Sequence, residues 1–214
     1  MSVQIKFCGM MRTRDVEAAL HNGASYVGAI MAGGPRNLSL RDAVATLAPA
    51  KGRAKRVVVI PPGRPAEIAE VAREFDVVQL HGDASSDDIL GLRELYSGEI
   101  WAVVRVGEEG MPAASRDLFS VADAIVFDKQ TANGLGGSGM PINWNSLSEQ
   151  LGAARPRRTI LAGGLNSSNV AEAISMLRPD VVDVASGVEA APGIKNHDLL
   201  RQFFQAVRSA EAVL

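Results

Sequence analysis

The sequence predicts an α/β fold, a single (β/α)8 TIM barrel with a parallel eight-stranded core that spans residues 1–214. Short β-branched runs alternate with longer segments of helical period eight times in succession, with no linker between them. One run, at residues 57–60, is apolar at every position, which is typical of a parallel strand covered on both faces. A doubly wound open sheet is the alternative, but eight units in this length suit a closed barrel better.

The expected strands are short apolar runs, each followed within two residues by a glycine, a proline or a polar residue. They lie within residues 3–9 and at 25–31, 55–60, 76–80, 99–106, 124–127, 158–162 and 181–185. Parallel strands joined by right-handed crossovers bring their carboxyl ends to one face of a barrel. Functional residues are therefore expected in the loops that follow the strands.

The expected helices alternate with these strands. They lie at residues 13–22, 39–47, 65–74, 85–95, 114–120, 144–151, 167–177 and 197–210. Thr13 and Ser39 are expected to cap the first two helices, and Ser85 or Ser86 the fourth. Gly23 follows the first helix, where a left-handed residue is favoured.

Composition and charge exclude several classes of protein. The net charge is −2, from 22 basic and 24 acidic residues without a basic block, so no nucleic-acid partner is expected. The single cysteine, Cys8, cannot form an internal disulfide, which suits a reducing cytosol. The N-terminus lacks a signal pattern, and no apolar run approaches the ~18 residues needed to span a bilayer. We therefore expect a soluble, cytoplasmic protein without a membrane partner.

Polar, glycine and cysteine residues just past the strands are expected to converge at the barrel mouth. They are Cys8, Arg36, His81, Arg105, Asp128, Gly163, Gly164, Ser186 and Gly187. The glycine pairs after the seventh and eighth strands favour phosphate binding, because backbone N–H groups there can point at an anion. Residues 188–194 have the length of the short extra helix that commonly assists. A tight strand-to-helix turn is the alternative for residues 163–164.

Cys8 and Asp128 are candidates for acid–base catalysis. Alternation along a strand places Cys8 on the face of Lys6, and Asp128 on the face of Val126 and Ala124. Burial in a partly desolvated pocket would raise the pKa of Asp128 and let it act as a general acid near neutral pH. Cys8 could act as a general base if its thiolate is stabilised. An ordinary buried cysteine and a capping aspartate are the alternatives.

Charged residues give two further predictions. Arg36 lies in a loop with two glycines and a proline, which could fix its planar guanidinium as a clamp for a carboxylate. A solvated loop arginine is the alternative. Lys6 and Asp183 have opposite charge and lie on buried strands, so they are expected to pair inside the barrel.

Neither a metal nor a nucleotide cofactor is expected. The three histidines, His21, His81 and His197, are scattered, and none has metal-ligand spacing with a carboxylate or a thiol. The glycines between residues 134 and 139 lack the strand, helix and lysine of a nucleotide-binding P-loop. Of the histidines, His81 lies at a strand end and is expected to shape the mouth.

The sequence resembles the phosphoribosylanthranilate isomerase family of tryptophan biosynthesis. The matching motifs, in chain order, are KFCG at 6–9, GPR at 34–36, VQLHG at 78–82, FD at 127–128, GGSG at 136–139, LAGGLN at 161–166, VDVASGVE at 182–189 and PG at 192–193. The chain departs from the family pattern after Gly139, where MPINW at 140–144 replaces a lysine and an aspartate before the tryptophan. Met10 and Met11 also replace a more usual β-branched pair.

The resemblance implies a (β/α)8 barrel that performs an Amadori rearrangement of N-(5-phosphoribosyl)anthranilate without cofactor or metal. It implies that Asp128 is the general acid, Cys8 the general base and Arg36 the clamp for the anthranilate carboxylate. The remaining substrate-binding residues implied by it are His81, Gly163, Gly164, Asn166, Ser186 and Gly187. Family barrels of this kind occur alone, paired or fused, so a monomer or a homodimer is expected.

Two rival interpretations remain open from sequence. A related barrel isomerase of histidine biosynthesis, or an enzyme that serves both pathways, acts on a substrate with two phosphates and uses paired aspartates. Here the first strand ends in Cys8, and the third ends in PPGR at 61–64, which does not resemble a second anion-binding loop. A noncatalytic phosphate-binding protein is expected to lack the acid–base pair, yet both Cys8 and Asp128 are present.

Overall fold

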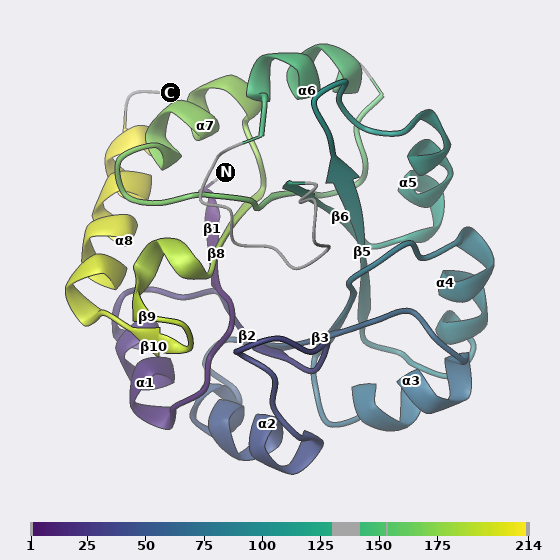
Figure 1. Ribbon diagram of the computed structural model, residues 1–214, viewed down its shortest axis with the longest axis horizontal. Coiled ribbons are helices and arrows are strands. Elements are labelled where there is room, and N and C mark those ends of the chain that lie inside the picture. The colour runs from purple at the N-terminus through teal and green to yellow at the C-terminus, as the bar shows by residue number, and fades with distance from the viewer. Residues whose placement is uncertain (1, 130–141, 153, 213–214) are drawn as a thin grey trace.

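A computed structural model of the chain contains a closed barrel of eight parallel strands (Figure 1). It describes residues 2–129, 142–152 and 154–212. The strand order follows the sequence, and β8 pairs with β1 to close the ring. Helices form an outer ring around the strands (Figure 1). The predicted (β/α)8 architecture is confirmed, and the doubly wound open sheet is excluded.

Each strand is followed by a helix. The strands are β1 (Gln4–Phe7), β2 (Tyr26–Ile30), β3 (Lys55–Ile60), β4 (Val77–Leu80), β5 (Glu99–Val106), β6 (Ala124–Lys129), β7 (Thr159–Leu161) and β8 (Val181–Val184). The helices are α1 (Thr13–His21), α2 (Leu40–Leu47), α3 (Pro65–Ala72), α4 (Ser86–Arg93), α5 (Leu118–Val121), α6 (Trp144–Leu151), α7 (Val170–Leu177) and α8 (His197–Glu211). The weak helix expected at 114–120 is a 3-10 helix, Ala113–Asp117, followed by the short α5.

The apolar core has two layers that the sheet separates. Outward side chains such as Ile5 and Val58 pack against the helices. Inward side chains fill the barrel, where the rings of Tyr26 and Trp101 meet at 4.9 Å between centroids. Because side chains alternate along a strand, every strand contributes to both layers. Runs such as β3 are therefore apolar at successive positions.

The helix caps follow local sequence in most places. Ser39 caps α2 by accepting the N–H of Asp42. Ser85, the first of the two candidates, caps α4 in a reciprocal capping box with Asp88. Gly23 follows α1 with φ of 69°, as predicted. The serine side chains accept backbone N–H groups at the start of their helices, and the glycine lets the chain turn at the end of α1.

The predicted cap of α1 is wrong by one residue. Arg12 is the N-cap, without a side-chain hydrogen bond to the helix, and Thr13 is the first helical residue. Instead, the Arg12 guanidinium donates to the carboxylate of Asp15, at 2.7 and 3.0 Å, and Asp15 is fully buried. A buried ion pair therefore replaces the hydroxyl cap that the sequence pattern predicts.

The predicted extra helix at 188–194 is also wrong. The chain after β8 forms one 3-10 turn, Ser186–Val188, and then a two-stranded hairpin, β9 (Glu189–Ala191) and β10 (Ile194–Lys195). Proline at 192 and glycine at 193, with φ of 76°, favour a turn between two extended segments over a helix. The hairpin brings Glu189 and Lys195 together on the eighth strand's carboxyl end.

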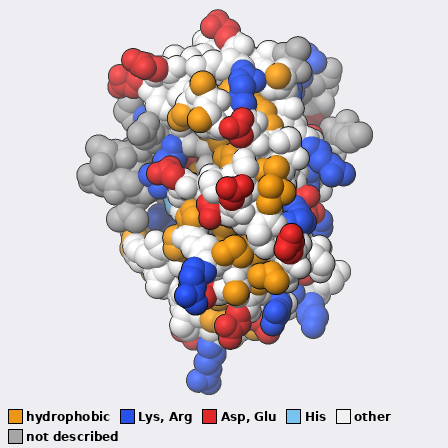
Figure 2. Space-filling view, turned by 90° about the vertical axis from the view of Figure 1, so that its right-hand side faces the viewer, with side chains coloured by type: hydrophobic (Ala, Val, Ile, Leu, Met, Phe, Trp, Pro, Cys, Tyr) orange, Lys and Arg blue, Asp and Glu red, His pale blue; other side chains and the backbone are white. Residues whose placement is uncertain are grey.

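The side of the molecule that carries α3 and α4 has no single sign of charge. Figure 2 shows acidic and basic side chains interspersed with hydrophobic ones on this side. This mixed surface agrees with the near-neutral composition. In the described ranges, we find no helix with the length and apolar character that crossing a bilayer requires.

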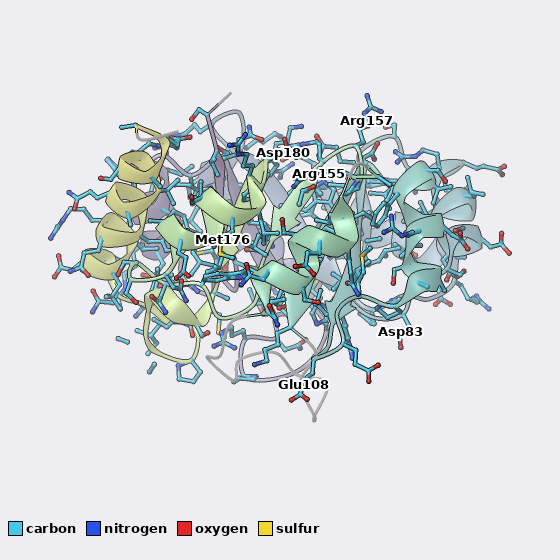
Figure 3. The ribbon with its side chains drawn as sticks, turned by 90° about the horizontal axis from the view of Figure 1, so that it is seen from above. Asp83, Glu108, Arg155, Arg157, Met176 and Asp180 are labelled. Atoms are coloured by element: carbon cyan, nitrogen blue, oxygen red, sulfur yellow. The ribbon has the colours of Figure 1, made fainter. Side chains whose placement is uncertain are left out.

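The two ends of the barrel carry different loops (Figure 3). Asp83 and Glu108 follow β4 and β5 and lie along one edge, whereas Arg157 and Asp180 precede β7 and β8 and lie along the opposite edge. In barrels of this kind, functional residues lie at the face formed by the carboxyl ends of the strands, and residues at the opposite face contribute to stability.

The amino-terminal end of the barrel is closed by Arg158. Its guanidinium donates to Glu99 at 3.1 Å, to Gln4 at 2.7 Å and to the hydroxyl oxygen of Tyr26 at 2.5 Å. Trp101 donates its indole N–H to the same carboxylate of Glu99 at 2.9 Å. Four strands are thereby joined at the floor, below the inward aromatic pair.

We predict that Arg158→Ala lowers the free energy of unfolding by about 2 kcal/mol, because it removes a charged donor from three partly buried acceptors. Urea denaturation followed by circular dichroism measures this change. Arg41→Ala on α2, where the side chain is exposed, is the matched control and should shift the value by less than about 0.5 kcal/mol. Equal, small shifts for both variants would contradict a stabilising role of the floor.

Candidate active site

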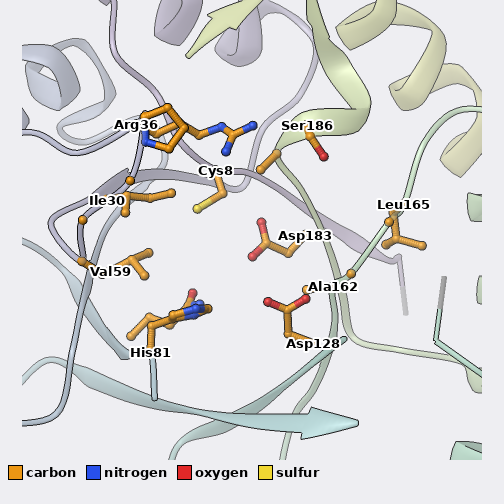
Figure 4. A pocket seen from close by; sticks show the side chains of 18 residues that line it. Cys8, Ile30, Arg36, Val59, His81, Asp128, Ala162, Leu165, Asp183 and Ser186 are labelled. Carbon is orange, nitrogen blue, oxygen red and sulfur yellow. The ribbon is translucent and has the colours of Figure 1, made fainter. Parts of the chain in front are cut away.

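One cavity of about 160 Å³ opens at the carboxyl ends of the strands (Figure 4). Most of the predicted site residues line it: Cys8, Arg36, His81, Asp128, Gly163, Gly164 and Ser186. Asn166, Gly187 and Arg105 are not among its lining residues. Apolar walls come from Ile30, Val59, Ala162 and Leu165. The glycines at 134, 136, 137 and 139 lie outside the described residues, as do Met140 and Pro141 of the changed MPINW segment.

A buried ion pair lies on the seam between the first and last strands. Lys6 and Asp183 are register partners of β1 and β8, and Lys6 Nζ donates to Asp183 Oδ2 at 2.6 Å. Lys6 also donates to Gln79 Oε1 at 3.0 Å. Burial lowers the pKa of Lys6, but Asp183 and Cys8 outweigh burial and raise it, so Lys6 is an ammonium. The predicted pairing of Lys6 with Asp183 is confirmed.

Cys8 is a buried thiol in the cavity wall. Burial raises the pKa of Cys8, and the nearby carboxylate of Asp183 raises it too, whereas Lys6 lowers it by charge and hydrogen bonding. The net direction is upward, because desolvation is the largest effect. Gly28 on the neighbouring strand leaves room for the thiol, since a Cβ there would come within 3.0 Å of Cys8 Sγ. Cys8 is therefore mostly a thiol near pH 7.

Asp128 lies across the cavity from His81, and its side chain points into the cavity (Figure 4). Burial raises the pKa of Asp128 to about 6, although the backbone N–H of Lys129 donates to its Oδ1 at 2.8 Å and opposes that rise. The charge of Asp183 raises it further. At pH 7 roughly one Asp128 in ten is protonated and able to donate a proton.

The pKa of Asp128, the candidate proton donor, is lower than that of Cys8, the candidate proton acceptor. A simple acid–base pair needs the opposite order. Catalysis by a proton donor at Asp128 and an acceptor at Cys8 needs Asp128 protonated and Cys8 ionised. Because the pKa of Asp128 is about 6 and burial raises that of the Cys8 thiol above its ordinary value, only a small minority of molecules hold both forms at once. The pair can still act, because the thiolate of a thiol with a raised pKa is a stronger base than the thiolate of a more acidic thiol.

His81 is a neutral side chain at the opposite wall. Burial lowers its pKa, and the positive charges of Arg105 and Lys6 lower it further. A neutral imidazole can donate one hydrogen bond and accept another. His81 is therefore suited to orienting a polar ligand rather than to pairing with an anion as a cation.

Arg36 is held by a second ion pair at the mouth. Its Nε and Nη2 donate to the two carboxylate oxygens of Glu189, at 2.9 and 2.6 Å. Lys195 Nζ donates to Glu189 Oε1 at 2.8 Å and to the carbonyl of Ala185 at 2.8 Å. Burial opposes ionisation of Glu189, but its hydrogen bonds from Arg36 and the charge of Lys195 hold its pKa below the usual range. Arg36 is thus a positioned cation and not a solvated loop residue.

The glycines after β7 lie against Asp128. Gly163 and Gly164 have φ of 82° and 72°, which point their backbone in directions that other residues rarely adopt. A Cβ at Gly163 would approach the Lys129 nitrogen to 2.8 Å and Asp128 Oδ1 to 3.0 Å. These glycines therefore make room for the buried carboxyl group, in addition to any role in binding an anion.

Asn166 and Gly187 serve local structure. Asn166 Oδ1 accepts the N–H of Ser168 at 2.8 Å, in a turn that delays the start of α7 from the predicted residue 167 to Val170. Gly187 packs on the loop after β7, where a Cβ would come within 2.0 Å of the Leu165 carbonyl oxygen. Both residues therefore contribute to the packing of the loops after β7 and β8, and their predicted role in binding substrate stays a prediction.

Sequence reasoning missed three residues that support the site: Gln79, Glu189 and Lys195. Each lies inside or next to a segment with strand character, where an isolated polar residue among apolar ones was the available signal. Their partners are distant in sequence, since Glu189 and Arg36 are separated by 153 positions. Within the described part of the chain, no three His, Cys, Asp or Glu side chains are grouped as a metal site would require.

Comparison with known proteins identifies relatives along nearly the whole chain. Residues 5–206 match the family model described as N-(5′-phosphoribosyl)anthranilate (PRA) isomerase. The N-(5′-phosphoribosyl)anthranilate isomerase of Afipia carboxidovorans is 35% identical, over 99% of this chain and 92% of the relative. The phosphoribosyl anthranilate isomerase of Thermotoga maritima is similar in structure, with a TM-score of 0.84, 29% identity, and coverage of 97% of this chain and 99% of that one.

A further similar structure holds a ligand. It is a phosphoribosyl anthranilate isomerase in complex with reduced 1-(o-carboxyphenylamino)-1-deoxyribulose 5-phosphate. Its TM-score is 0.79 at 28% identity, with 97% of this chain and 99% of that chain covered. All three comparisons agree on one family, and their coverage leaves no large segment of this chain unmatched.

We predict that iodoacetamide alkylates Cys8 with a pH midpoint higher than that of glutathione, because the thiolate is the nucleophile and burial raises the pKa of this thiol. Cys8 is the single cysteine, so mass spectrometry of the peptide that contains it separates its alkylation from that of lysine side chains at high pH. Lys6→Met should move the midpoint to still higher pH. Glutathione under the same conditions is the reference thiol, and a plateau already reached at pH 7 would contradict the raised pKa.

Proposed function

The chain belongs to the N-(5′-phosphoribosyl)anthranilate isomerase family of tryptophan biosynthesis, and we propose that Cys8 and Asp128 carry the proton transfers of that isomerisation. The reaction converts N-(5-phosphoribosyl)anthranilate, an aminoaldose, into 1-(2-carboxyphenylamino)-1-deoxyribulose 5-phosphate. The observation that carries the proposal is the meeting of one thiol and one carboxyl group of raised pKa in a single cavity. We further propose that the protein acts in the cytoplasm, as a monomer or a homodimer.

Asp128 acts first, as the general acid. Its proton passes to the ribose ring oxygen, the bond between that oxygen and C1′ breaks, and the nitrogen lone pair forms a C1′=N double bond. The product of this step is an open-chain iminium, or protonated Schiff base. A carboxyl group with a pKa of about 6 is acidic enough to donate and is still partly protonated near neutral pH.

Cys8 acts second, as the general base. The thiolate takes the proton from C2′, the C–H electron pair forms a C1′=C2′ bond, and the nitrogen regains its lone pair. The resulting enolamine tautomerises to the ketone product. The ammonium of Lys6 opposes the effect of desolvation on the pKa of Cys8, so a fraction of the thiol can ionise in this buried position.

The substrate's two anionic ends fit two parts of the cavity. Arg36 is suited to the anthranilate carboxylate, because Glu189 occupies one edge of its guanidinium and leaves the rest of the fork for a second carboxylate. Glu189 and Lys195 neutralise each other, so a net positive charge is left at Arg36. The glycine backbone after β7, with Ser186 after β8, is suited to the phosphate. His81 faces the ribose between these ends.

We predict that Cys8→Ala and Asp128→Asn each lower kcat by a factor on the order of 10² or more, because each removes one proton-transfer group. The fluorescence of phosphoribosylanthranilate measures its consumption by the purified proteins. Asp83→Asn, an exposed aspartate on the same end of the barrel, is the matched control and should leave kcat unchanged. Near-normal turnover by both site variants, with circular dichroism unchanged, would overturn the assignment.

We predict that Glu189→Gln raises KM for phosphoribosylanthranilate about 10-fold, because the amide retains one acceptor and no charge to fix Arg36. Phosphoribosylaniline, which lacks the carboxylate, should show little change between the two proteins. Steady-state kinetics with both substrates measures the difference. An equal rise in KM for both substrates would show that Glu189 supports the fold of the mouth in general and does not position Arg36.

A further inference from the structure

Asp183 carries a carboxylate oxygen that no described group satisfies. Its Oδ2 accepts from Lys6, whereas Oδ1 is buried and has no hydrogen-bond partner. The side chain is only 7% exposed. An unpaired buried acceptor is costly and rare in folded proteins, and each one requires a physical explanation.

The position of Asp183 supplies that explanation. Asp183 lines the cavity, and its carboxylate lies between Cys8 and Asp128 (Figure 4). In the proposed reaction Cys8 works at C2′ and Asp128 at the ring oxygen on C1′. A side chain between them faces C1′ and the nitrogen attached to it. Lys6 donates to one oxygen of this carboxylate and is itself held by Gln79, so the carboxylate is fixed in place.

We propose that Asp183 is a further catalytic residue, whose carboxylate accepts a hydrogen bond from the substrate nitrogen and stabilises the iminium cation. This inference rests on the proposed function. The nitrogen is a neutral arylamine in the substrate, carries a positive charge after ring opening, and is neutral again in the enolamine. No atom is transferred to Asp183, which stays a carboxylate throughout.

A fixed carboxylate at this place favours the charged intermediate over the substrate. Its attraction to the nitrogen grows as the C1′=N bond forms, so it lowers the barrier to ring opening more than it tightens binding. The low-dielectric cavity strengthens this effect. Asp183 also keeps Asp128 partly protonated by like charge, which serves the same step.

The test is Asp183→Asn, which preserves size and an oxygen acceptor for Lys6 but removes the charge that faces the nitrogen. We expect kcat to fall about 10²-fold while KM changes less than about threefold. The affinity for reduced 1-(o-carboxyphenylamino)-1-deoxyribulose 5-phosphate, whose nitrogen is a neutral amine, should also change little. Loss of affinity for this analogue in step with kcat would overturn the inference, because it would indicate uniform binding.

A second readout reports on charge at the nitrogen. Phosphoribosyl derivatives of 5-methylanthranilate and 5-chloroanthranilate differ in how well the ring supports an iminium. The kcat ratio of the methyl to the chloro substrate should be larger in Asp183→Asn than in the unsubstituted protein, because the variant stabilises the cation less. A merely structural aspartate predicts equal ratios in the two proteins, so equal ratios would overturn the proposed contact.

A paired comparison covers the case in which Asp183→Asn does not fold around an unpaired Lys6. Lys6→Met and the double variant Lys6→Met/Asp183→Asn both lack the ammonium, so their kcat values isolate the carboxylate. A further drop in the double variant supports the inference, and equal values contradict it. Failure of the proposed function looks different, since the unsubstituted protein itself would then not consume phosphoribosylanthranilate.

Discussion

The Lys6–Asp183 ion pair spans the seam at which the barrel closes. Strand β1 can pair with β8 in several registers that keep inward and outward faces consistent, and the register found brings these two charges opposite each other. A buried ammonium without this partner would be strongly destabilised, so the pair favours one closure over its neighbours. The same register brings Cys8, which is two residues beyond Lys6 and directly follows β1, beside the pair. The strand pairing that closes the barrel therefore also positions the residues of the site.

The barrel separates stability from chemistry along its axis. At the floor, Arg158 joins four strands through acceptors that are all satisfied. At the mouth, polar groups are left with capacity to spare: a carboxylate oxygen at Asp183, a free edge of Arg36 and a carboxyl group of raised pKa at Asp128. Groups kept unsatisfied by a rigid scaffold are ready for a ligand without reorganisation. The floor supplies that rigidity.

Sequence patterns predicted the barrel because its signals are local. Apolar runs, caps such as Ser39 and the order of eight units need no knowledge of distant contacts. That Cys8 and Asp128 line one cavity could be predicted for the same reason, since each lies at the carboxyl end of a strand. What local patterns could not show is partnership: Glu189 with Arg36, or Gln79 with Lys6, across many intervening residues. The segment Glu189–Lys195 was predicted as a helix from its length alone, whereas its local Pro192–Gly193 turn favours the hairpin, which the ion pairs of Glu189 with Arg36 and Lys195 then hold at the mouth.

The same desolvation that makes the site reactive also sets its limit. Burial keeps Asp128 partly protonated, and it also makes the Cys8 thiolate scarce. A lysine beside a cysteine lowers its pKa most when no anion is near, but here Asp183 neutralises Lys6 and itself opposes ionisation of the thiol. That arrangement is unfavourable for the base taken alone. In the proposed mechanism it becomes favourable once the iminium forms, because the cation at the nitrogen would add a positive charge next to both Asp183 and Cys8. Formation of the iminium would then promote ionisation of Cys8, so proton donation by Asp128 would assist the proton removal that follows.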